Sequence, residues 1–179
     1  MTADLEKDRM KTAKNQAVLS IALSRNRLGL AVYRDGFLEY YRGKTLRQFR
    51  RRRQRSHAVA RILRDLIGHY SPGELLMPQL NTQQRHSDEL RALYSLSGRI
   101  VEQEGLLLHL YDQTDVKAAI CEGEKGTNAN VELKLIKQYP ELERYCRARV
   151  EWERRYYRLV FQAIAAGEAR CKEKYAINR

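Results

Sequence analysis

The pattern of apolar and polar positions predicts three consecutive strands near the beginning of the chain. An almost continuous apolar run at residues 17–23 is typical of a central strand. A second apolar segment covers residues 28–34, and Asp35-Gly36 is a hairpin signal that separates it from residues 37–42. Because apolar and polar side chains are mixed in this third segment, we expect it to be an edge strand.

The rest of the chain alternates between helix and strand patterns. Residues 46–69 predict a long helix, because apolar residues repeat at helical spacing until a Ser-Pro-Gly sequence ends it. Residues 74–80 and 106–111 predict the fourth and fifth strands, the fifth buried, and residues 87–103 predict an amphipathic helix between them. Further helices are expected over residues 115–121, from Thr127 or Asn128 to Tyr139, and from Pro140 to residue 174. This order predicts an α/β fold with a mixed five-stranded sheet flanked by helices.

The length and the distribution of residue types predict one domain. Residues 1–14 are polar and are expected to form a flexible N-terminal segment, and residues 15–179 suit a single core. No apolar run has the length of a membrane span. Cys121, Cys146 and Cys171 are far apart and form no CxxC pair. They therefore predict neither a zinc site nor a disulfide framework, and they fit a reducing cytoplasm.

The chain carries a strong excess of positive charge, with 34 Lys and Arg against 22 Asp and Glu and a formal net charge of +12. A basic surface attracts phosphate, so nucleic acid is the expected partner, although an acidic protein would respond to the same field. No membrane partner is expected. The densest cluster comprises Lys44, Arg47, Arg50, Arg51, Arg52, Arg53 and Arg55. It predicts a clamp on the phosphate backbone, and the alternative is a solvated helix end.

The order of elements and several local motifs resemble those of RuvC-type Holliday-junction resolvases, which have the ribonuclease H-like fold. The family's passage from helix to fourth strand is similar to HYSPGELLMPQL, and its fifth strand, VK helix and glycine loop are similar to LLLHLYDQTDVKAAICEGEKGTNANVELKLI. The family's last helix is similar to YRLVFQAIAAGEA. The resemblance covers residues 17–169. It implies a protein that binds branched DNA as a homodimer, with residues 87–103 as the expected dimer face.

The resemblance also locates the carboxylates with which such enzymes hold two divalent cations. Oxygen ligands are needed there because Mg²⁺ binds few other groups, and two cations stabilise the attacking and leaving oxygens. The matching positions in this chain are Ala22, Pro78, Arg155 and Arg158. Alanine and proline offer no side-chain oxygen, and arginine repels a cation. We therefore expect no metal cofactor and a catalytically inactive relative that binds structured or branched DNA through its phosphate backbone.

Two other functions fit the same sequence. The first is an active, magnesium-dependent endonuclease whose acidic groups have moved to Asp112, Asp115, Glu151 or Glu153, although capping a helix is the more common use of Asp112. The second is a protein-interaction module whose basic helix meets an acidic partner.

Further cations are candidates for phosphate contacts outside the densest cluster. Arg25 and Arg27 follow the first strand, and with Arg155 and Arg158 they are expected near the cleft where the family holds its metals. Lys117 matches the lysine of the VK motif, and Lys125 lies in the adjacent glycine loop. The alternative is that these side chains are ordinary solvated charges, or that the arginines of the last helix pair with glutamates one turn away.

Aromatic and histidine side chains give weaker signals. Tyr40, Tyr41, Tyr156 and Tyr157 either stack on bases or fill half-buried faces of strands and helices, and packing is the more common use. His109 lies in an apolar segment without a second histidine at ligand spacing. It is expected in the core or at a dimer face rather than on a metal.

Overall fold

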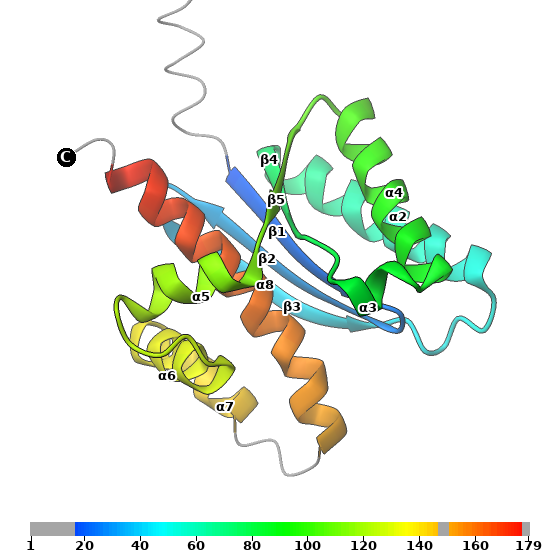
Figure 1. Cartoon of the computed structure of the whole chain (residues 1–179). Helices are drawn as coiled ribbons and strands as arrows, with labels where there is room; N and C mark the ends of the chain where they lie inside the picture. The colour runs from blue at the N-terminus through cyan, green and yellow to red at the C-terminus, as the bar shows by residue number, and fades with distance from the viewer. Residues whose placement is uncertain (1–16, 147–150, 177–179) are drawn as a thin grey trace, which may run out of the picture.

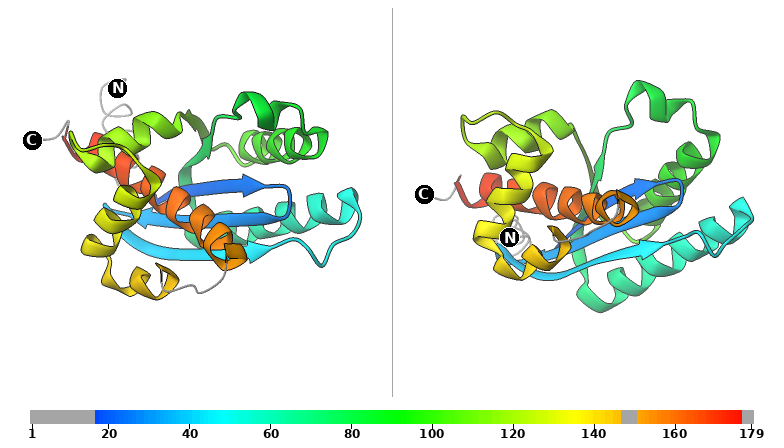
Figure 2. Two further views of the ribbon diagram at one scale, coloured as in Figure 1. Left: turned by 60° about the horizontal axis from the view of Figure 1, so that its bottom comes forward. Right: turned by 90° about the horizontal axis from the view of Figure 1, so that it is seen from below.

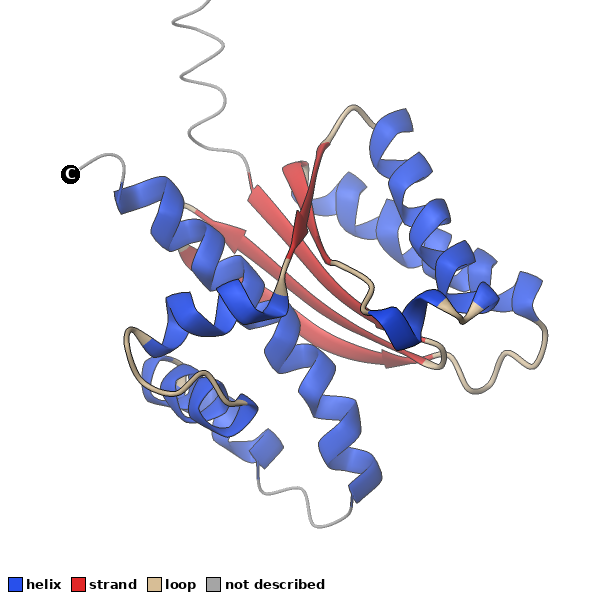
Figure 3. Ribbon diagram, viewed as in Figure 1, coloured by secondary structure: helices blue, strands red, loops and turns tan. Residues whose placement is uncertain are grey.

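The central element of the protein is a five-stranded mixed sheet (Figure 3). The computed structural model describes residues 17–146 and 151–176, and the side chains of residues 17–146 and 156–174. The strands are β1 (Ala17–Ser24), β2 (Arg27–Arg34), β3 (Phe37–Thr45), β4 (Pro72–Pro78) and β5 (Leu107–Tyr111). Their order in the sheet is β3-β2-β1-β4-β5. β1 pairs antiparallel with β2 and parallel with β4, and β4 pairs parallel with β5, which confirms the predicted fold class.

Helices cover both faces of this sheet (Figures 1 and 2). One face carries α2 (Arg52–Tyr70) and α4 (Asp88–Gln103), with the short α3 (Thr82–Arg85) before α4. The other face carries α5 (Gln113–Cys121), α6 (Asn128–Gln138), η1 (Pro140–Leu142), α7 (Glu143–Cys146) and α8 (Glu151–Ala176). Among the described helices, none combines the length and the apolar character that crossing a lipid bilayer requires.

Side chains of β1 alternate between two hydrophobic cores, one on each face of the sheet. Leu19, Ile21 and Leu23 belong to the core beneath α2 and α4, whereas Val18 and Ala22 belong to the core beneath α5, α6 and α8. This alternation follows from the two-residue repeat of a strand. All five side chains are almost completely buried, as the apolar run at residues 17–23 predicts for a central strand.

Two glycines allow α8 to lie directly on the strands. A Cβ atom at Gly29 of β2 would lie 2.1 Å from the carbonyl oxygen of Leu159, and one at Gly167 of α8 would lie 2.3 Å from the ring of Tyr33. The Tyr33 hydroxyl also donates a hydrogen bond of 3.0 Å to the carbonyl oxygen of Ile164. α8 is therefore fixed against β2 by close backbone approach at one point and by a buried hydrogen bond at another.

The long helix begins later than its sequence pattern predicts. β3 continues to Thr45, and residues 46–51 form a connection before α2 begins at Arg52. Leu46 is completely buried, and its backbone nitrogen donates to the carbonyl oxygen of Asn26 at 2.7 Å. This anchor holds the connection out of the helix. The crowded positive charges that follow would repel one another within a helical turn.

The fifth strand is not buried, contrary to the prediction from its apolar run. Among the described strands β5 pairs only with β4, at one edge of the sheet, and Leu107 and Leu110 expose 67% and 54% of their surface. The position of a strand in the sheet decides how much of it is covered, and the run of leucines does not encode that position.

The predicted helix from Pro140 to residue 174 is also divided. Pro140 opens the single turn η1, α7 follows it, and α8 begins only at Glu151. Residues 147–150 between α7 and α8 lie outside the described residues.

Alanine substitutions at two glycines that do not contact α8 should change the stability of the fold in opposite directions. Gly68 lies in the exposed last part of α2 with no atom within 4 Å of an added Cβ, so Gly68→Ala should stabilise the fold by about 0.5–1 kcal/mol. Gly105 adopts a φ of +70°, where an L side chain is strained, so Gly105→Ala should destabilise it by about 1 kcal/mol. Urea unfolding of both variants measures the two changes. Equal effects of the two substitutions would contradict the conformational argument.

Candidate nucleic-acid interface

The parallel strands bring several chain segments together at one end of the sheet. The carboxyl ends of β1, β4 and β5 point in the same direction, and β2 begins and β3 ends beside them. We call this region the carboxyl end of the sheet. In open α/β sheets, ligands are bound where the carboxyl ends of parallel strands meet.

Two positions that hold a carboxylate in the resembling family, but not in this chain, lie side by side on neighbouring strands at this end. The parallel register pairs Ser20 with Leu76, and its continuation by two residues brings Ala22 of β1 beside Pro78 of β4. Both residues are buried, and Ala22 has no exposed surface. Ala22 packs in the core that includes Val160 of α8. Apolar contacts therefore fill the place where the resemblance predicts a cation site.

Arg158 lies next to these two positions along α8. It directly precedes Leu159, whose carbonyl oxygen faces Gly29, and Gly29 is paired with Ala22 across β1 and β2. The side chain of Arg158 is exposed and lines a pocket together with Lys117 and Asn128. The structure thus brings together Arg158 and Lys117, which are distant in the sequence. Arg155 lies in α8, but its side chain is outside the described residues.

Arg158 also lines a second pocket, of about 250 Å³. Among the described residues, the two pockets share one acidic side chain and have no other. That residue is Glu132 of α6. Burial raises the pKa of the Glu132 carboxyl, and the positive charge of Arg158 partly opposes the increase. Glu132 was not predicted from the sequence as part of the site, since its helical spacing is that of an ordinary surface position.

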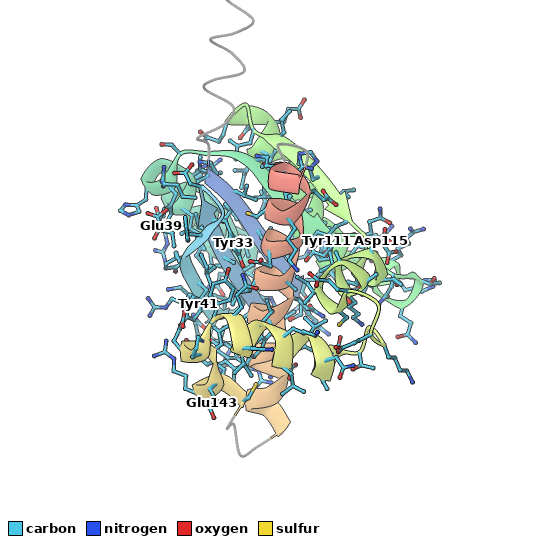
Figure 4. All side chains as sticks on the ribbon, turned by 90° about the vertical axis from the view of Figure 1, so that its left-hand side faces the viewer. Tyr33, Glu39, Tyr41, Tyr111, Asp115 and Glu143 are labelled. Carbon is cyan, nitrogen blue, oxygen red and sulfur yellow. The ribbon has the colours of Figure 1, made fainter. Side chains whose placement is uncertain are left out.

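Two of the four acidic side chains proposed as relocated metal ligands, Asp112 and Asp115, lie among the described residues, and they form no cation site there. Asp112 caps α5: its carboxylate accepts a hydrogen bond of 2.6 Å from the backbone nitrogen of Thr114, and this bond lowers its pKa. Asp115 is exposed in the first turn of the same helix, and it lines a pocket together with Tyr111, near which it lies in Figure 4. The side chains of Glu151 and Glu153 are outside the described residues. Within the described part of the chain, no three His, Cys, Asp or Glu side chains are placed to hold a metal.

The residues at the carboxyl end therefore do not fit a pair of divalent cations. Ala22 and Pro78 provide no side-chain oxygen, and Arg158 is positively charged. Such a site requires several converging oxygen ligands with a net negative charge.

Cations surround the carboxyl end of the sheet instead. Arg25 lies exposed in the turn between β1 and β2, and the half-buried Arg27 begins β2. Lys44, also half-buried, lies near the end of β3, where it is paired with Leu28. The connection to α2 and the first turn of that helix add five exposed arginines: Arg47, Arg50, Arg51, Arg52 and Arg53. Lys125 lies apart from them, in the exposed loop between α5 and α6.

Glu89 of α4 limits how many of these cations are available. Its carboxylate contacts Arg55 at 2.5 Å and Arg25 at 2.7 Å. Arg55 exposes only 12% of its side chain and also donates to the Asn26 side chain at 3.1 Å, so it joins α2 to α4 and to the hairpin. Arg25 remains 69% exposed and keeps a free side of its guanidinium. Arg55 is therefore mainly a structural residue.

The first turn of α2 is electrostatically unfavourable in the isolated protein. Arg51 is the N-cap, Arg52 and Arg53 follow, and this turn contains no acidic side chain. The backbone of a helix already places partial positive charge at its N-terminus, so these arginines increase a repulsion. A phosphate bound there would relieve it, because helix N-termini and guanidinium groups both bind anions.

Four tyrosines pack against one another between β3, α7 and α8. Ring centroids of Tyr41 and Tyr145 are 5.9 Å apart, those of Tyr145 and Tyr157 are 4.5 Å apart, and those of Tyr156 and Tyr157 are 5.1 Å apart. All four are half-buried, and Arg144 lies 4.9 Å above the ring of Tyr145. Tyr40 packs separately against Tyr70 at 5.6 Å. The structure thus favours the packing role of these residues.

A buried carboxylate at the other end of the sheet was not predicted from the sequence. Glu74 of β4 exposes 4% of its side chain, and its carboxylate contacts Arg170 at 3.0 Å, His109 at 2.9 Å and the ammonium group of Lys174. Burial alone would raise the pKa of Glu74, but Lys174 and Arg170 together lower it. His109, expected in the core or at a dimer face, instead belongs to this ion cluster, which joins β4, β5 and α8.

Comparison with known proteins identifies the architecture. The sequence matches no family model and no curated protein. The solved structure of Thermus thermophilus RuvC with a Holliday junction substrate superposes with a TM-score of 0.69 over 89% of this chain and 96% of that one, at 12% identity. The chain has a RuvC-like fold. Thermus thermophilus RuvC alone gives a TM-score of 0.68 at 14% identity, with the same coverage of both chains.

A mitochondrial protein of known structure supports the same RuvC-like fold. The yeast mitochondrial Holliday junction resolvase Ydc2 gives a TM-score of 0.64 at 13% identity, over 93% of this chain and 82% of that one. The predicted resemblance in fold is confirmed. At such identities a common fold does not establish a common chemistry, which must be argued from the residues at the carboxyl end.

Proposed function

We propose that this protein binds structured or branched DNA through its phosphate backbone and does not cleave it. One observation carries the proposal: Ala22, Pro78 and Arg158, the positions where the resemblance predicts carboxylates, lie at the carboxyl end of the sheet, and exposed arginines surround the same place. The RuvC-like fold supports DNA as the ligand, because one structural neighbour is in complex with a Holliday junction substrate. A homodimer through residues 87–103 and a cytoplasmic location belong to the same proposal.

Charge and geometry at the carboxyl end support backbone recognition rather than base recognition. The guanidinium groups of Arg47, Arg50 and Arg51 are exposed on a connection, not on a helix that enters a groove. Contacts of this kind position a protein on phosphates without reading base edges. Preference among nucleic acids then depends on the shape that presents several phosphates to this surface at once.

A binding titration tests the proposal. We expect a fluorescent four-way junction to bind more tightly than a duplex of equal length or a single-stranded RNA, with affinity that falls steeply with salt. Added Mg²⁺ should leave every strand intact on a denaturing gel. Metal-dependent cleavage would contradict the inactive site, and failure to bind any of the three ligands at low salt would refute nucleic-acid binding.

Charge substitutions at the carboxyl end locate the interface. The triple variant R47Q/R50Q/R51Q should raise the Kd for the junction by roughly 10- to 100-fold and reduce the slope of log K against log salt by about 2–3, since each phosphate contact contributes about one. The matched control R34Q/K134Q/K172Q removes the same charge from side chains that pair with Glu39, Glu124 and Glu122. An equal loss in the control would show that only net charge matters.

A further inference from the structure

The pocket of about 250 Å³ described above lies between α6, α7 and α8, on the face of the sheet opposite α4 (Figure 1). Three of its lining residues are aromatic, namely Tyr145, Tyr157 and Phe161. The rest of its described lining comprises Glu132, Cys146 and Arg158. We call it the aromatic pocket. Its volume far exceeds the roughly 10–15 Å³ that one water molecule requires, so an organic group can enter it.

Contacts among the aromatic side chains hold the rings of the pocket in place before any ligand binds. The rings of Tyr145 and Tyr157 are 4.5 Å apart, and Tyr41 of β3 contacts Tyr145 edge-on at 5.9 Å. Phe161 is almost completely buried in the core between the sheet and α8. Because these rings are already ordered, a ligand that contacts them costs little side-chain entropy. A flat heterocycle gains from such rings whether it meets them by the face or by the edge.

Glu132 gives the aromatic pocket hydrogen-bond acceptors that lack a donor. Its side chain is half-buried, and burial raises the pKa of its carboxyl because the charged form is poorly solvated there. No described residue donates a hydrogen bond to Glu132 or forms a close ion pair with it, and Arg158 acts on it only through its electric field. Hydrogen bonds from a ligand would replace the hydration that this carboxylate has lost. The pocket therefore favours a ligand with N–H donors.

Arg158 connects the aromatic pocket with the carboxyl end of the sheet. It lines the pocket, and along α8 it directly precedes Leu159, which lies against Gly29 and so next to Ala22. A nucleotide whose phosphate contacts Arg158 can therefore place its base against the aromatic rings. A homodimer through residues 87–103 would use the opposite face of the sheet, so it leaves this pocket accessible.

We propose that the aromatic pocket takes one unstacked base from the branch point of the bound DNA and selects guanine. The inference rests on the proposed function for the identity of the ligand, and it adds one base contact to the phosphate contacts of the exposed arginines. Bases outside a stacked helix are recognised by stacking on aromatic side chains and by hydrogen bonds to their Watson–Crick edge. Removing a base from its stack costs least where the base is unpaired, so a branch point supplies it most readily.

The chemistry of Glu132 favours guanine over the other DNA bases. An ionised carboxylate only accepts hydrogen bonds, through two oxygens. Guanine presents two adjacent N–H donors on its Watson–Crick edge, one on the ring and one on the amino group, and these match the two oxygens. Adenine and cytosine present an amino group beside a ring nitrogen that is itself an acceptor, and thymine presents one N–H between two carbonyl oxygens. Each of these three bases therefore places an acceptor against the carboxylate.

The test uses the full chain and a series of four-way junctions that differ only in one unpaired nucleotide at the branch point. This nucleotide carries guanine, hypoxanthine, adenine, cytosine, thymine or no base. Wild-type protein should bind the guanine junction roughly 5- to 100-fold more tightly than the adenine junction, the discrimination expected of a good bidentate contact. Hypoxanthine lacks the amino group of guanine and should lose most of this advantage. Fluorescence anisotropy at one salt concentration measures each Kd.

Three variants separate base reading from net charge and from stacking. Glu132→Gln should remove the preference for guanine, because an amide has one acceptor oxygen, and should leave the Kd for the abasic junction unchanged. The matched control Glu141→Gln removes the same charge from an exposed position of η1 outside the pocket and should keep the preference. Tyr145→Leu should weaken binding of all four bases relative to the abasic junction, since stacking on an aromatic ring tolerates any base. Thermal melts confirm that each variant is folded.

The possible results separate this inference from the proposed function. If wild-type protein binds none of the junctions, the proposed function fails. If it binds all six with the same Kd, or if Glu132→Gln keeps the preference for guanine, the aromatic pocket does not read a base and only this inference is overturned. Loss of the preference in Glu141→Gln as well would attribute it to net charge and would likewise overturn the inference.

Discussion

Gly29→Ala is expected to lower the free energy of unfolding by about 3 kcal/mol or more, a large effect for a single added methyl group. The added Cβ would lie 2.1 Å from the carbonyl oxygen of Leu159 and 2.7 Å from the backbone nitrogen of Val160. Backbone atoms cannot move aside by a change of rotamer, so α8 must shift away from β2. Denaturant unfolding followed by circular dichroism measures the loss.

A comparison with Gly43 distinguishes a backbone clash from a side-chain clash. A Cβ at Gly43 would lie 2.7 Å from the ring of Tyr156, which is a side chain. Gly43→Ala should therefore cost less than Gly29→Ala, and Tyr156→Ala should remove part of that cost in a double-mutant cycle. Leu159→Ala should not rescue Gly29→Ala, because it leaves the carbonyl in place. Rescue by Leu159→Ala would disprove the backbone contact.

Glu74→Gln is expected to destabilise the protein by about 2–4 kcal/mol. The substitution removes the negative charge that Arg170, Lys174 and His109 share and leaves these groups without their common partner. Glu173→Gln is the matched control, since Glu173 also pairs with Arg170, at 3.2 Å, but is 64% exposed. Exposed pairs contribute little, so the control should cost less than about 0.5 kcal/mol.

The contacts of Glu74 also predict how the stability difference between the wild type and Glu74→Gln depends on pH. Lys174 and Arg170 hold the pKa of Glu74 below its ordinary value of 4.5, despite its burial. A carboxyl whose pKa is lower in the folded state stabilises the protein above its unfolded value, and this stabilisation is lost as pH falls through the folded value. The difference in Tm between wild type and Glu74→Gln should therefore be full at pH 7 and shrink below about pH 4.5. A difference that stays constant down to pH 3 would exclude the charge interaction as its cause.

The spacing of apolar residues predicted which segments form strands and helices better than it predicted how buried each element is. The apolar run at residues 17–23 indicated a buried strand correctly, because strands paired on both sides and covered on both faces select such residues. The run at 106–111 has the same character, yet β5 is an edge strand. Only the pairing of distant segments distinguishes the two cases, and a local pattern does not contain it. The start of α2 was missed for a similar reason, since the burial of Leu46 against the hairpin prevents an earlier helix.

The sequence predicted the cations of the candidate site but not the acidic side chains that pair with cations. The arginines of residues 47–53 are concentrated in sequence and are exposed in space. Glu89 and Glu74 look like ordinary surface glutamates in the sequence, but the fold brings each to two or more cations. Arg53, Arg64 and Arg99 are likewise scattered in the sequence, and only the packing of α2 against α4 brings them to one pocket.

The contact between α8 and β2 has a consequence for synthesis of the chain on the ribosome. Tyr33 and Ile164 are joined by a hydrogen bond across 131 residues. At 5–20 residues per second, roughly 7–26 s separate the appearance of the hairpin from that of its covering helix. During this interval the apolar face of the first three strands has no native cover. Exposed apolar surface and unpaired strand edges favour association with other chains, so this interval is when the nascent protein is most prone to aggregate.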